Sequence, residues 1–412
     1  MEKKPEVSIV RCRETDNVEA IKRSIEEAFR LIGGITTVLR KEDRVVIKPN
    51  LLLPVPHTSG ATTNPFVVEA LIDLLRDTGV KKVVIAEGAV VGEKTEKCFS
   101  VCGYDTLAER KKVPLVNLKK DEFIPLGLSN GKMFRILRLP RTIVDADAVI
   151  DVPVLKTHDC FPVSLGLKNM KGVIHEKDKQ KFHLLDLAQC IVDLNKLVLP
   201  RITLIDGTVG LEGMGPVYGI PADAGVIITS FDCVACDAVG SAFMGIDPYE
   251  TSYIALAEEQ GLGIADLRKI MIQGESLEEA GMKFKRISLE GILDSEDFKK
   301  HHVRLLDRGG CSGCRSVLTA LISDLYDKGQ VHRIADSTIL LGQNISTEEM
   351  DKIEGKVICF GACTRHVKRD GDIFLFGCPP HILDVKKALG YTKEDFDNFS
   401  FLETHLKSFG WH

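Results

Sequence analysis

The sequence predicts an α/β protein with a Rossmann-like parallel-sheet domain over residues 1–290 and a smaller, cysteine-containing α/β domain over residues 291–412. First, short apolar runs typical of buried strands alternate with helical stretches, which indicates parallel strands joined by crossover helices. Second, several of these runs end in charged or glycine residues. Third, four cysteines lie in turns rich in glycine or proline beyond residue 309. A chain of 412 residues is long enough for two domains.

The first part of the large domain alternates strands and helices regularly. Asn17 is the expected cap of the first helix, and Thr63-Asn64-Pro65 is a strong start signal for the second, with proline in the first turn. The expected elements are a strand at 7–10, a helix stopped by Gly33 and Gly34, a strand at 44–48, a helix ending at Gly79 and a strand at 82–86. This order predicts a parallel sheet.

The same alternation continues along the rest of the large domain. We expect strands at 146–151, 201–205 and 225–229, and helices at 182–198 and 232–244. Residues 269–297 are less periodic, and we interpret them as the bridge to the second domain.

Composition limits the classes of partner. The net charge of −5 provides no global basic surface, so we expect no nucleic-acid partner. The charged N-terminus lacks the apolar segment of a signal peptide, and no run reaches the roughly 18 apolar residues of a membrane helix. We therefore expect no membrane partner. Twelve cysteines without an export signal favour a reducing, cytoplasmic location. The sequence is compatible with an oligomer.

Four cysteines form the clearest candidate metal site. Cys311 and Cys314 are a C-x-x-C pair, while Cys363 and Cys378 each follow an apolar run that is typical of a buried strand. Parallel strands bring such turns to one edge of a sheet. Thiolates converging there suit a soft metal or an iron–sulfur cluster. A structural zinc site is the main alternative, and a disulfide is a weaker one.

The cysteine motif resembles that of nickel–iron hydrogenase small subunits and of the related cluster-bearing subunit of respiratory NADH dehydrogenase. The resemblance rests on Cys-Ser-Gly-Cys, Gly-Ala-Cys and Gly-Cys-Pro-Pro, within about the last hundred residues. It implies that Cys311, Cys314, Cys363 and Cys378 hold one [4Fe–4S] cluster. The last two cysteines are closer in sequence than in that family pattern, so Cys359 stays an alternative to Cys363.

Polar residues at the strand ends of the large domain form a second candidate site. Ligands of open α/β sheets bind at the carboxyl ends of the strands, and two glycine-rich stretches, 166–172 and 207–216, follow such ends. Lysines and backbone amides there could hold an anion, although they could also only cap helices and form turns. The residues expected to bind a substrate or cofactor are Lys48, Asn50, Lys168, Asn169, Lys171, Asp206 and Gly213.

Three residues are candidates for catalysis. His158 and His175 can carry protons near neutral pH, and Lys156 ends a strand close to His158 in the sequence. Lys156 would also help Lys48, Lys168 and Lys171 to hold the anion. The sequence contains no phosphate-loop motif, no dinucleotide fingerprint and no H-E-x-x-H zinc motif.

Residues 7–279 resemble the family called domain of unknown function number 362. The resemblance rests on several motifs in the expected order: Ile47-Lys48-Pro49-Asn50, Thr62-Thr63-Asn64-Pro65, Leu155-Lys156-Thr157-His158, 166–172 and Asp206-Gly207. The family is often coupled to iron–sulfur domains, which supports a cluster in the second domain. Many members carry a ferredoxin module with C-x-x-C-x-x-C runs, whereas this chain has the split motif instead.

These observations predict an iron–sulfur oxidoreductase of anaerobic metabolism that acts on a small anionic substrate through a [4Fe–4S] cluster. An external ferredoxin is the expected electron partner. Two alternatives remain open. One is a non-redox isomerase or hydro-lyase, in which the metal site is structural or acts as a Lewis acid. The other is an electron-transfer or cluster-carrier protein without a substrate of its own.

Overall fold

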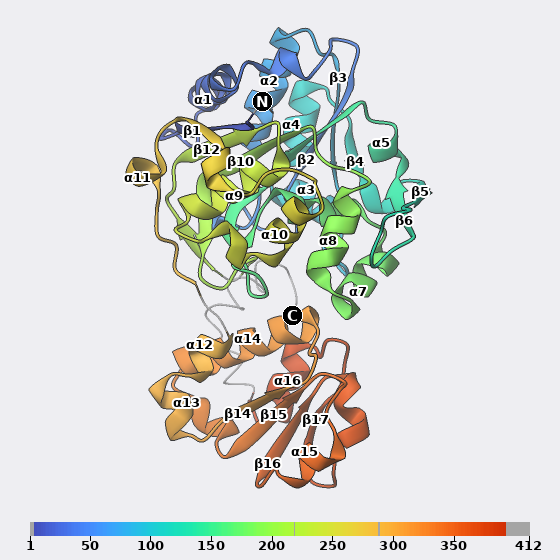
Figure 1. Ribbon diagram of the computed structural model, residues 1–412, viewed down its shortest axis with the longest axis vertical. Coiled ribbons are helices and arrows are strands. Elements are labelled where there is room, and N and C mark those ends of the chain that lie inside the picture. The colour runs from blue at the N-terminus through green and yellow to red at the C-terminus, as the bar shows by residue number, and fades with distance from the viewer. Residues whose placement is uncertain (1–3, 218, 287–288, 393–412) are drawn as a thin grey trace. The chain divides into compact units, whose positions relative to one another are not determined.

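The computed structural model describes residues 4–217, 219–286 and 289–392. The chain divides into two units, Met1–Arg286 and Ile287–His412, which we call the large unit and the small unit (Figure 1). The sequence placed this boundary between residues 290 and 291. The predicted α/β class is confirmed, because each unit contains a parallel or mainly parallel sheet and helices.

The large unit is built on an eleven-stranded sheet whose main path runs β13-β1-β12-β10-β7-β2-β3-β4. Strands β10, β7, β2, β3 and β4 are parallel to one another, and β13 is parallel to β1. Strand β12 is antiparallel to both of its neighbours, so the sheet is mixed rather than wholly parallel. The strands span β1 (Glu6–Arg11), β2 (Arg44–Pro49), β3 (Lys82–Glu87), β4 (Leu115–Asn117), β7 (Ala148–Val152), β8 (Val154–Thr157), β9 (Val163–Ser164), β10 (Ile202–Glu212), β11 (Ile220–Ala222), β12 (Val226–Ser230) and β13 (Met271–Gly274).

Strand β10 corrects one prediction. The sequence predicted that this strand ends near Asp206 and that a glycine-rich loop follows, yet β10 continues to Glu212. Its glycines permit close neighbours: a Cβ on Gly207 would lie 2.6 Å from a methyl group of Val226, and one on Gly210 would lie 2.9 Å from the carbonyl oxygen of Leu155. Glycine inside a strand often marks such a close approach.

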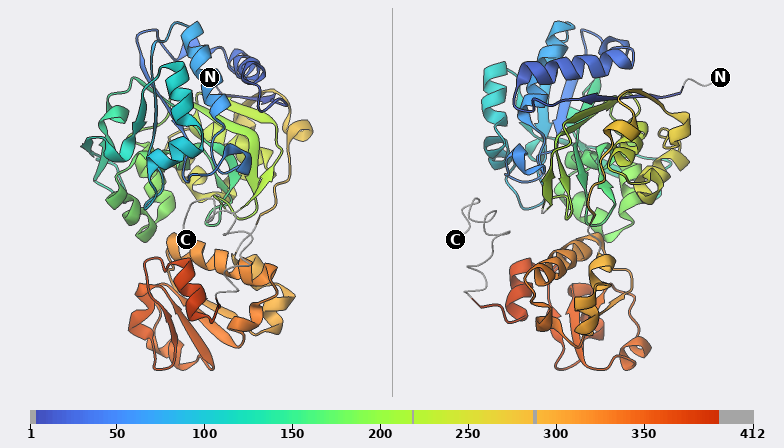
Figure 2. Two further views of the ribbon diagram at one scale, coloured as in Figure 1. Left: turned by 180° about the vertical axis from the view of Figure 1, so that it is seen from behind. Right: turned by 90° about the vertical axis from the view of Figure 1, so that its left-hand side faces the viewer.

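Two hydrophobic cores cover the two faces of the large sheet. Along β2, Val45 and Ile47 face one core and Val46 faces the other, as the twofold periodicity of a strand requires. One core is covered by the N-terminal helices and the other by α8, α9 and α10 (Figures 1 and 2). The helices of this unit span α1 (Val18–Leu31), α2 (Pro65–Asp77), α3 (Thr95–Val101), α4 (Tyr104–Lys111), α5 (Arg141–Val144), α6 (Gly166–Asn169), α7 (Glu176–Leu184), α8 (Leu187–Asn195), α9 (Cys233–Phe243), α10 (Ser252–Glu259) and α11 (Leu277–Ala280).

Local signals account for most helix boundaries. The side chain of Asn17 caps α1, and that of Asn64 caps α2, which begins with Pro65. The single helix predicted at 182–198 is wrong, because α7 and α8 are separate. Helix α7 ends at Leu184, and Asp186 caps α8 by accepting a hydrogen bond from the Gln189 amide. The predicted bridge at 269–297 also contains β13, which pairs with β1.

The small unit contains a four-stranded parallel sheet in the order β14-β15-β16-β17. Core residues alternate along β16: Ile358 and Phe360 pack on the face covered by α14, and Val357 and Cys359 pack on the other face. The elements span β14 (Arg304–Asp307), β15 (Ser337–Leu341), β16 (Lys356–Phe360), β17 (Ile373–Leu375), α12 (Leu289–Leu293), α13 (Glu296–Lys300), α14 (Ser312–Asp327), α15 (Thr347–Asp351) and α16 (Ile382–Ala388). A separate hairpin, β5 (Phe123–Gly127) and β6 (Ile136–Pro140), belongs to the large unit.

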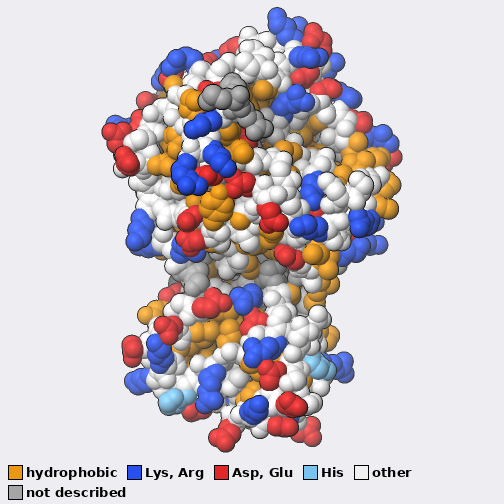
Figure 3. All heavy atoms as spheres, viewed as in Figure 1, with side chains coloured by type: hydrophobic (Ala, Val, Ile, Leu, Met, Phe, Trp, Pro, Cys, Tyr) orange, Lys and Arg blue, Asp and Glu red, His pale blue; other side chains and the backbone are white. Residues whose placement is uncertain are grey.

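Charges of both signs are mixed on the visible surface. On the face shown in Figure 3, acidic and basic side chains of the described residues are interspersed, without a broad patch of one sign. Within the described ranges, no helix combines the length and the apolarity that crossing a bilayer requires.

Candidate functional site

A buried ion pair lies at the carboxyl ends of β2 and β3. The Lys48 ammonium is 2.7 Å from the Glu87 carboxylate, with side-chain exposures of 0% and 3%. Lys48 also donates to the carbonyl oxygen of Pro49, and the Gly88 amide donates to Glu87. Lys48 therefore stabilises the junction of the two strands and does not line the adjacent cavity.

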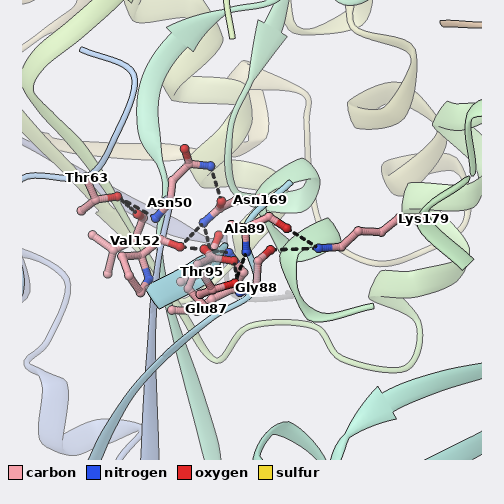
Figure 4. Close-up of polar contacts among 12 residues, drawn as sticks. Asn50, Thr63, Glu87, Gly88, Ala89, Thr95, Val152, Asn169 and Lys179 are labelled. Carbon is pink, nitrogen blue, oxygen red and sulfur yellow. Dashed lines mark hydrogen bonds and ion pairs between the residues drawn. The ribbon is translucent and has the colours of Figure 1, made fainter. Parts of the chain in front are cut away.

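A chain of hydrogen bonds joins β7 to the predicted catalytic lysine, Lys156. The Asn169 amide donates to Asp151 at 2.7 Å, the Asn50 amide donates to Asn169 at 2.6 Å, and the Lys156 ammonium donates to Asn50 at 2.8 Å. Figure 4 shows Asn50 and Asn169 facing each other. Lys156 also donates to the carbonyl oxygens of Ala61 and Pro216. These hydrogen bonds fix the position of the Lys156 ammonium group.

Beside this chain lies a cavity of about 120 Å³ with four lysines in its lining: Lys156, Lys168, Lys171 and Lys179. Lys179 donates to the carbonyl oxygens of Gly88 and Ala89, as Figure 4 shows, and Lys168 donates to Ser164. Such a concentration of ammonium groups makes the cavity suited to an anion. The structure thus brings together five of the predicted residues: Asn50, Lys156, Lys168, Asn169 and Lys171.

Burial shifts the protonation of these lysines. It lowers the pKa of Lys168 to about 8 and that of Lys179 to about 8. Burial and the charges of Lys168 and Lys179 lower the pKa of Lys171 to about 7. Burial, then the charges of Lys168 and Lys48, also lower the pKa of Lys156. Near neutral pH some of these lysines are therefore partly deprotonated, and a bound anion would favour their charged forms.

Two glycines form the tight contact beneath the cavity. A Cβ on Gly172 would overlap the Glu87 carboxylate and would lie 2.8 Å and 2.9 Å from Cε and Nζ of Lys48. A Cβ on Gly88 would lie 2.6 Å from the carbonyl oxygen of Gly172. The segment 166–172, which forms α6 and the start of a 3₁₀ turn, thus packs directly on the buried ion pair, and glycine is required at position 172 by space.

Replacing Gly172 by alanine is expected to destabilise the large unit by about 1–3 kcal/mol, the usual effect of overpacking. The added methyl group would separate Lys48 from Glu87. Urea unfolding measures the change, and Gly127→Ala is the matched control, because a Cβ on Gly127 meets nothing within 4 Å. Equal stability of the two variants would contradict the packing described here.

The two predicted histidines occupy different settings. His158 follows β8, is 9% exposed, and its Nδ1 lies 2.7 Å from Asp159; burial, then the charge of Lys168, lowers its pKa to about 4. His175 instead caps α7, where it accepts a hydrogen bond from the Lys177 amide, and it packs against Phe123. It is absent from the cavity lining.

His158, Asp159 and Cys160 bring three ligand atoms within 4.8 Å of one another. Imidazole, carboxylate and thiol are all ligands of Zn²⁺ and related ions. The Asp159 and Cys160 charges influence the pKa of Lys168, which places the set close to the cavity. Sequence reasoning missed Cys160, since one cysteine in a short loop carries no spacing signal.

Two other predicted residues serve the fold. Asp206 accepts hydrogen bonds from the Asn64 amide and from Thr208, and thus joins β10 to the start of α2. The carbonyl oxygen of Gly213 accepts a hydrogen bond from Thr157. Neither residue lines the cavity. Sequence reasoning also missed Lys179, whose segment in α7 reads as a charged, exposed stretch.

The four predicted cysteine ligands lie near one another in the small unit. Cys311 caps α14, Cys314 lies in its first turn, and Cys363 and Cys378 follow β16 and β17. The thiols of Cys311, Cys363 and Cys378 all act on the pKa of Cys314. A Cβ on Gly361 would lie 2.9 Å from the sulfur of Cys314 and 3.7 Å from that of Cys363, so glycine leaves the space between them open.

Hydrogen bonds polarise this group of thiols. The Cys314 thiol and the backbone amides of Cys314 and Gly313 donate to the sulfur of Cys311, which lowers the pKa of Cys311 to about 6. The Gly342 amide donates to Cys363. Such donors are typical around cluster-bound thiolates. Cys359, in contrast, is fully buried in the opposite core, where burial raises its pKa to about 11.

Comparison with known proteins gives a family and two similar proteins. A thylakoid-associated protein, sll1697, from Synechocystis sp. is 28% identical over 248 residues, which cover 58% of this chain and 74% of that protein. The lactate racemase apoprotein from Thermoanaerobacterium thermosaccharolyticum aligns with a TM-score of 0.38 and 13% identity, over 56% of this chain and 55% of the racemase. The chain therefore spans little more than half of the racemase.

The family match covers the part of the large unit that contains the lysine cavity. It ends before the cysteines of the small unit, so their likeness to hydrogenase small subunits stays a prediction. Residues 45–242 match the family model described as domain of unknown function (DUF362), and this part of the chain belongs to that family, as its motifs predicted.

Proposed function

We propose that the protein is an iron–sulfur oxidoreductase that binds a small anionic substrate in the lysine cavity and carries a [4Fe–4S] cluster on Cys311, Cys314, Cys363 and Cys378. The observation that carries the proposal is the convergence of these four thiols at one edge of the small parallel sheet. A ferredoxin would exchange electrons with the cluster, and a reducing compartment such as the cytoplasm would protect it.

The donor set of the small unit fits such a cluster. Four cysteines are the usual ligands, and backbone amides already donate to Cys311 and Cys363. Cys363 and Cys378 are exposed, so iron and sulfide can reach the site. A bound cluster would supply one electron at a time.

The large unit would bind and protonate the substrate. Lys156 is held in place by three oxygen acceptors, while Lys168 and Lys179 can donate further hydrogen bonds. His158, close to Lys168, is the candidate proton carrier, and the neighbouring carboxylate of Asp159 would orient its ring. His175 would act indirectly, because it caps α7, the helix that carries Lys179.

A second candidate function rests on His158, Asp159 and Cys160. Three protein ligands with a vacant coordination position are typical of catalytic zinc sites. A metal there would polarise a substrate carbonyl, as a non-redox isomerase or hydro-lyase requires. The cluster in the small unit would then be structural.

Metal and sulfide analysis of protein purified without oxygen tests the leading proposal. We expect about four iron atoms and four labile sulfides per chain, with a visible absorbance band that bleaches on reduction by dithionite. One zinc per chain without labile sulfide would overturn the iron–sulfur assignment. A second metal that depends on Cys160 would favour the second candidate function.

A further inference from the structure

Ser164 has a hydroxyl group in the lysine cavity to which the proposed function gives no role. The residue ends β9, is 5% exposed and belongs to the lining of the cavity. Its Oγ lies 3.3 Å from the Nζ of Lys168. A hydroxyl within hydrogen-bond reach of a basic nitrogen, inside a cavity, is the usual arrangement of an activated nucleophile, and the contact is often loose before a substrate binds.

The hydrogen bonding of Lys168 suits a neutral amine better than an ammonium group. An ammonium group has three N–H groups to satisfy, and Lys156 has three oxygen acceptors for them. Lys168 has a single hydrogen-bond partner among the described residues, the hydroxyl of Ser164. The lone pair of a neutral amine accepts one hydrogen bond, so the hydroxyl can donate to it. In this form Lys168 is a base for the Ser164 proton.

Burial favours the neutral form of Lys168. It lowers the pKa of Lys168 to about 8, although the charges of Asp159 and Cys160 act in the opposite direction. A lysine whose pKa lies close to the working pH can both accept a proton and return it. The titratable groups that interact electrostatically with Lys168 are Lys156, His158, Asp159, Cys160 and Lys171.

Positive charge lies beside the Ser164 hydroxyl, where an oxyanion would form. Lys156 and Ser164 are paired residues of the antiparallel strands β8 and β9, so their side chains project from the same face. Lys171 lines the same cavity. The Asn50 amide donates one N–H group to Asn169 and has a second one. Ammonium charges and amide N–H groups are the kinds of group that stabilise the negative oxygen of a tetrahedral intermediate.

The cavity limits the size of a substrate. Its volume is about 120 Å³, which suits a short acyl group rather than a long chain. Leu52, Val90 and Val91 belong to the lining and provide apolar contacts for such a group.

We propose that Ser164 and Lys168 form a serine–lysine dyad that transfers the acyl group of a short ester, with Ser164 as the nucleophile. The Ser164 Oγ forms a bond to the acyl carbon, and its proton passes to the Nζ of Lys168. The bond from that carbon to the alcohol oxygen then breaks, and Lys168 returns the proton to this oxygen. Water, activated by Lys168 in the same way, hydrolyses the acyl-serine. No electron is transferred, so this activity goes beyond the proposed function and does not need the cluster.

Labelling of the full-length protein with a short-chain alkyl fluorophosphonate tests the dyad. The serine oxygen would displace fluoride from phosphorus, and mass spectrometry of proteolytic peptides locates the adduct. We expect one adduct per chain, on Ser164. The labelling rate should rise roughly tenfold per pH unit well below the pKa of Lys168, because only the neutral amine accepts the proton. It should level off above this pKa, which is about 8.

Substitutions of the two residues link the reaction to the dyad. Lys168→Met removes the base, and labelling should slow at least about a hundredfold, within the range of general base catalysis. Lys168→Arg keeps the positive charge, cannot accept a proton and should be equally slow. Ser164→Ala should lose the adduct and slow the hydrolysis of 4-nitrophenyl acetate to a similar extent. Lys352→Met, at an exposed lysine of the small unit, is the control and should react at the unmodified rate.

The outcomes separate the dyad from the proposed oxidoreductase. An adduct on another residue, or no adduct, would overturn the dyad and leave the oxidoreductase in place, as would unchanged labelling in Lys168→Met. If circular dichroism shows that the Lys168 variants do not fold, the site and the pH dependence of labelling in the unmodified protein decide. Labelling of Ser164 in protein that assembles no iron–sulfur cluster would support the dyad and count against the oxidoreductase.

Discussion

Replacing Glu87 by alanine is expected to lower the free energy of unfolding by about 3–5 kcal/mol, because the Lys48 ammonium would remain buried without its partner. The pair is separated by 2.7 Å, and neither side chain is more than 3% exposed. The Gly88 amide would also lose its acceptor. Urea unfolding followed by circular dichroism measures the effect.

Two further variants isolate the cause. Glu27 forms an exposed ion pair with Arg30 on α1, so Glu27→Ala should leave the unfolding free energy nearly unchanged. The double variant Lys48→Met/Glu87→Leu removes both charges and should recover much of the stability lost in Glu87→Ala. A double variant that is no more stable than Glu87→Ala would mean that packing, and not the unpaired charge, dominates.

Local patterns account for the parts of the fold that the sequence predicted. The apolar residues of β2 are buried on both faces, which is why a continuous Val-Val-Ile run reads as a central strand. Asn17 and Asn64 act as caps because their side chains satisfy amides in the first turn of a helix, an interaction within two or three residues. Such signals depend on neighbours in the sequence alone.

Features that depend on distant residues escaped the same reasoning. Gly207 and Gly210 look like loop residues, yet their contacts with Val226 and Leu155 explain why they belong to a strand. The antiparallel direction of β12 is equally a matter of pairing with β1 and β10. Neither feature can be recognised from the local periodicity of the sequence.

The candidate site shows the same division. Lys156 and Asn50 could be predicted because parallel strands bring their carboxyl ends to one edge of a sheet. Lys179 could not, because it reaches the cavity from α7, a helix with charged residues on either side of it. Lys48 was expected in the cavity, but its pairing with Glu87 depends on the register of β2 and β3.

Replacing Cys363 by alanine is expected to abolish assembly of a [4Fe–4S] cluster, whereas replacing Cys359 is expected to leave the cluster intact. Cys363 lies beside Gly361, across from the sulfur of Cys314, and is exposed. Cys359 is fully buried in the core on the other face of β16. Because residues along a strand alternate between faces, its thiol cannot turn towards Cys314 without disrupting that core.

Iron content and visible absorbance of the two variants, both prepared without oxygen, measure this difference. Cys359→Ala is the matched control, since it removes a thiol four residues away and tests whether any lost cysteine bleaches the protein. Loss of colour in Cys359→Ala with retention in Cys363→Ala would reverse the ligand assignment. Retention in both would place the metal away from this turn, and the spacing of Cys363 and Cys378 would then have no role in cluster binding.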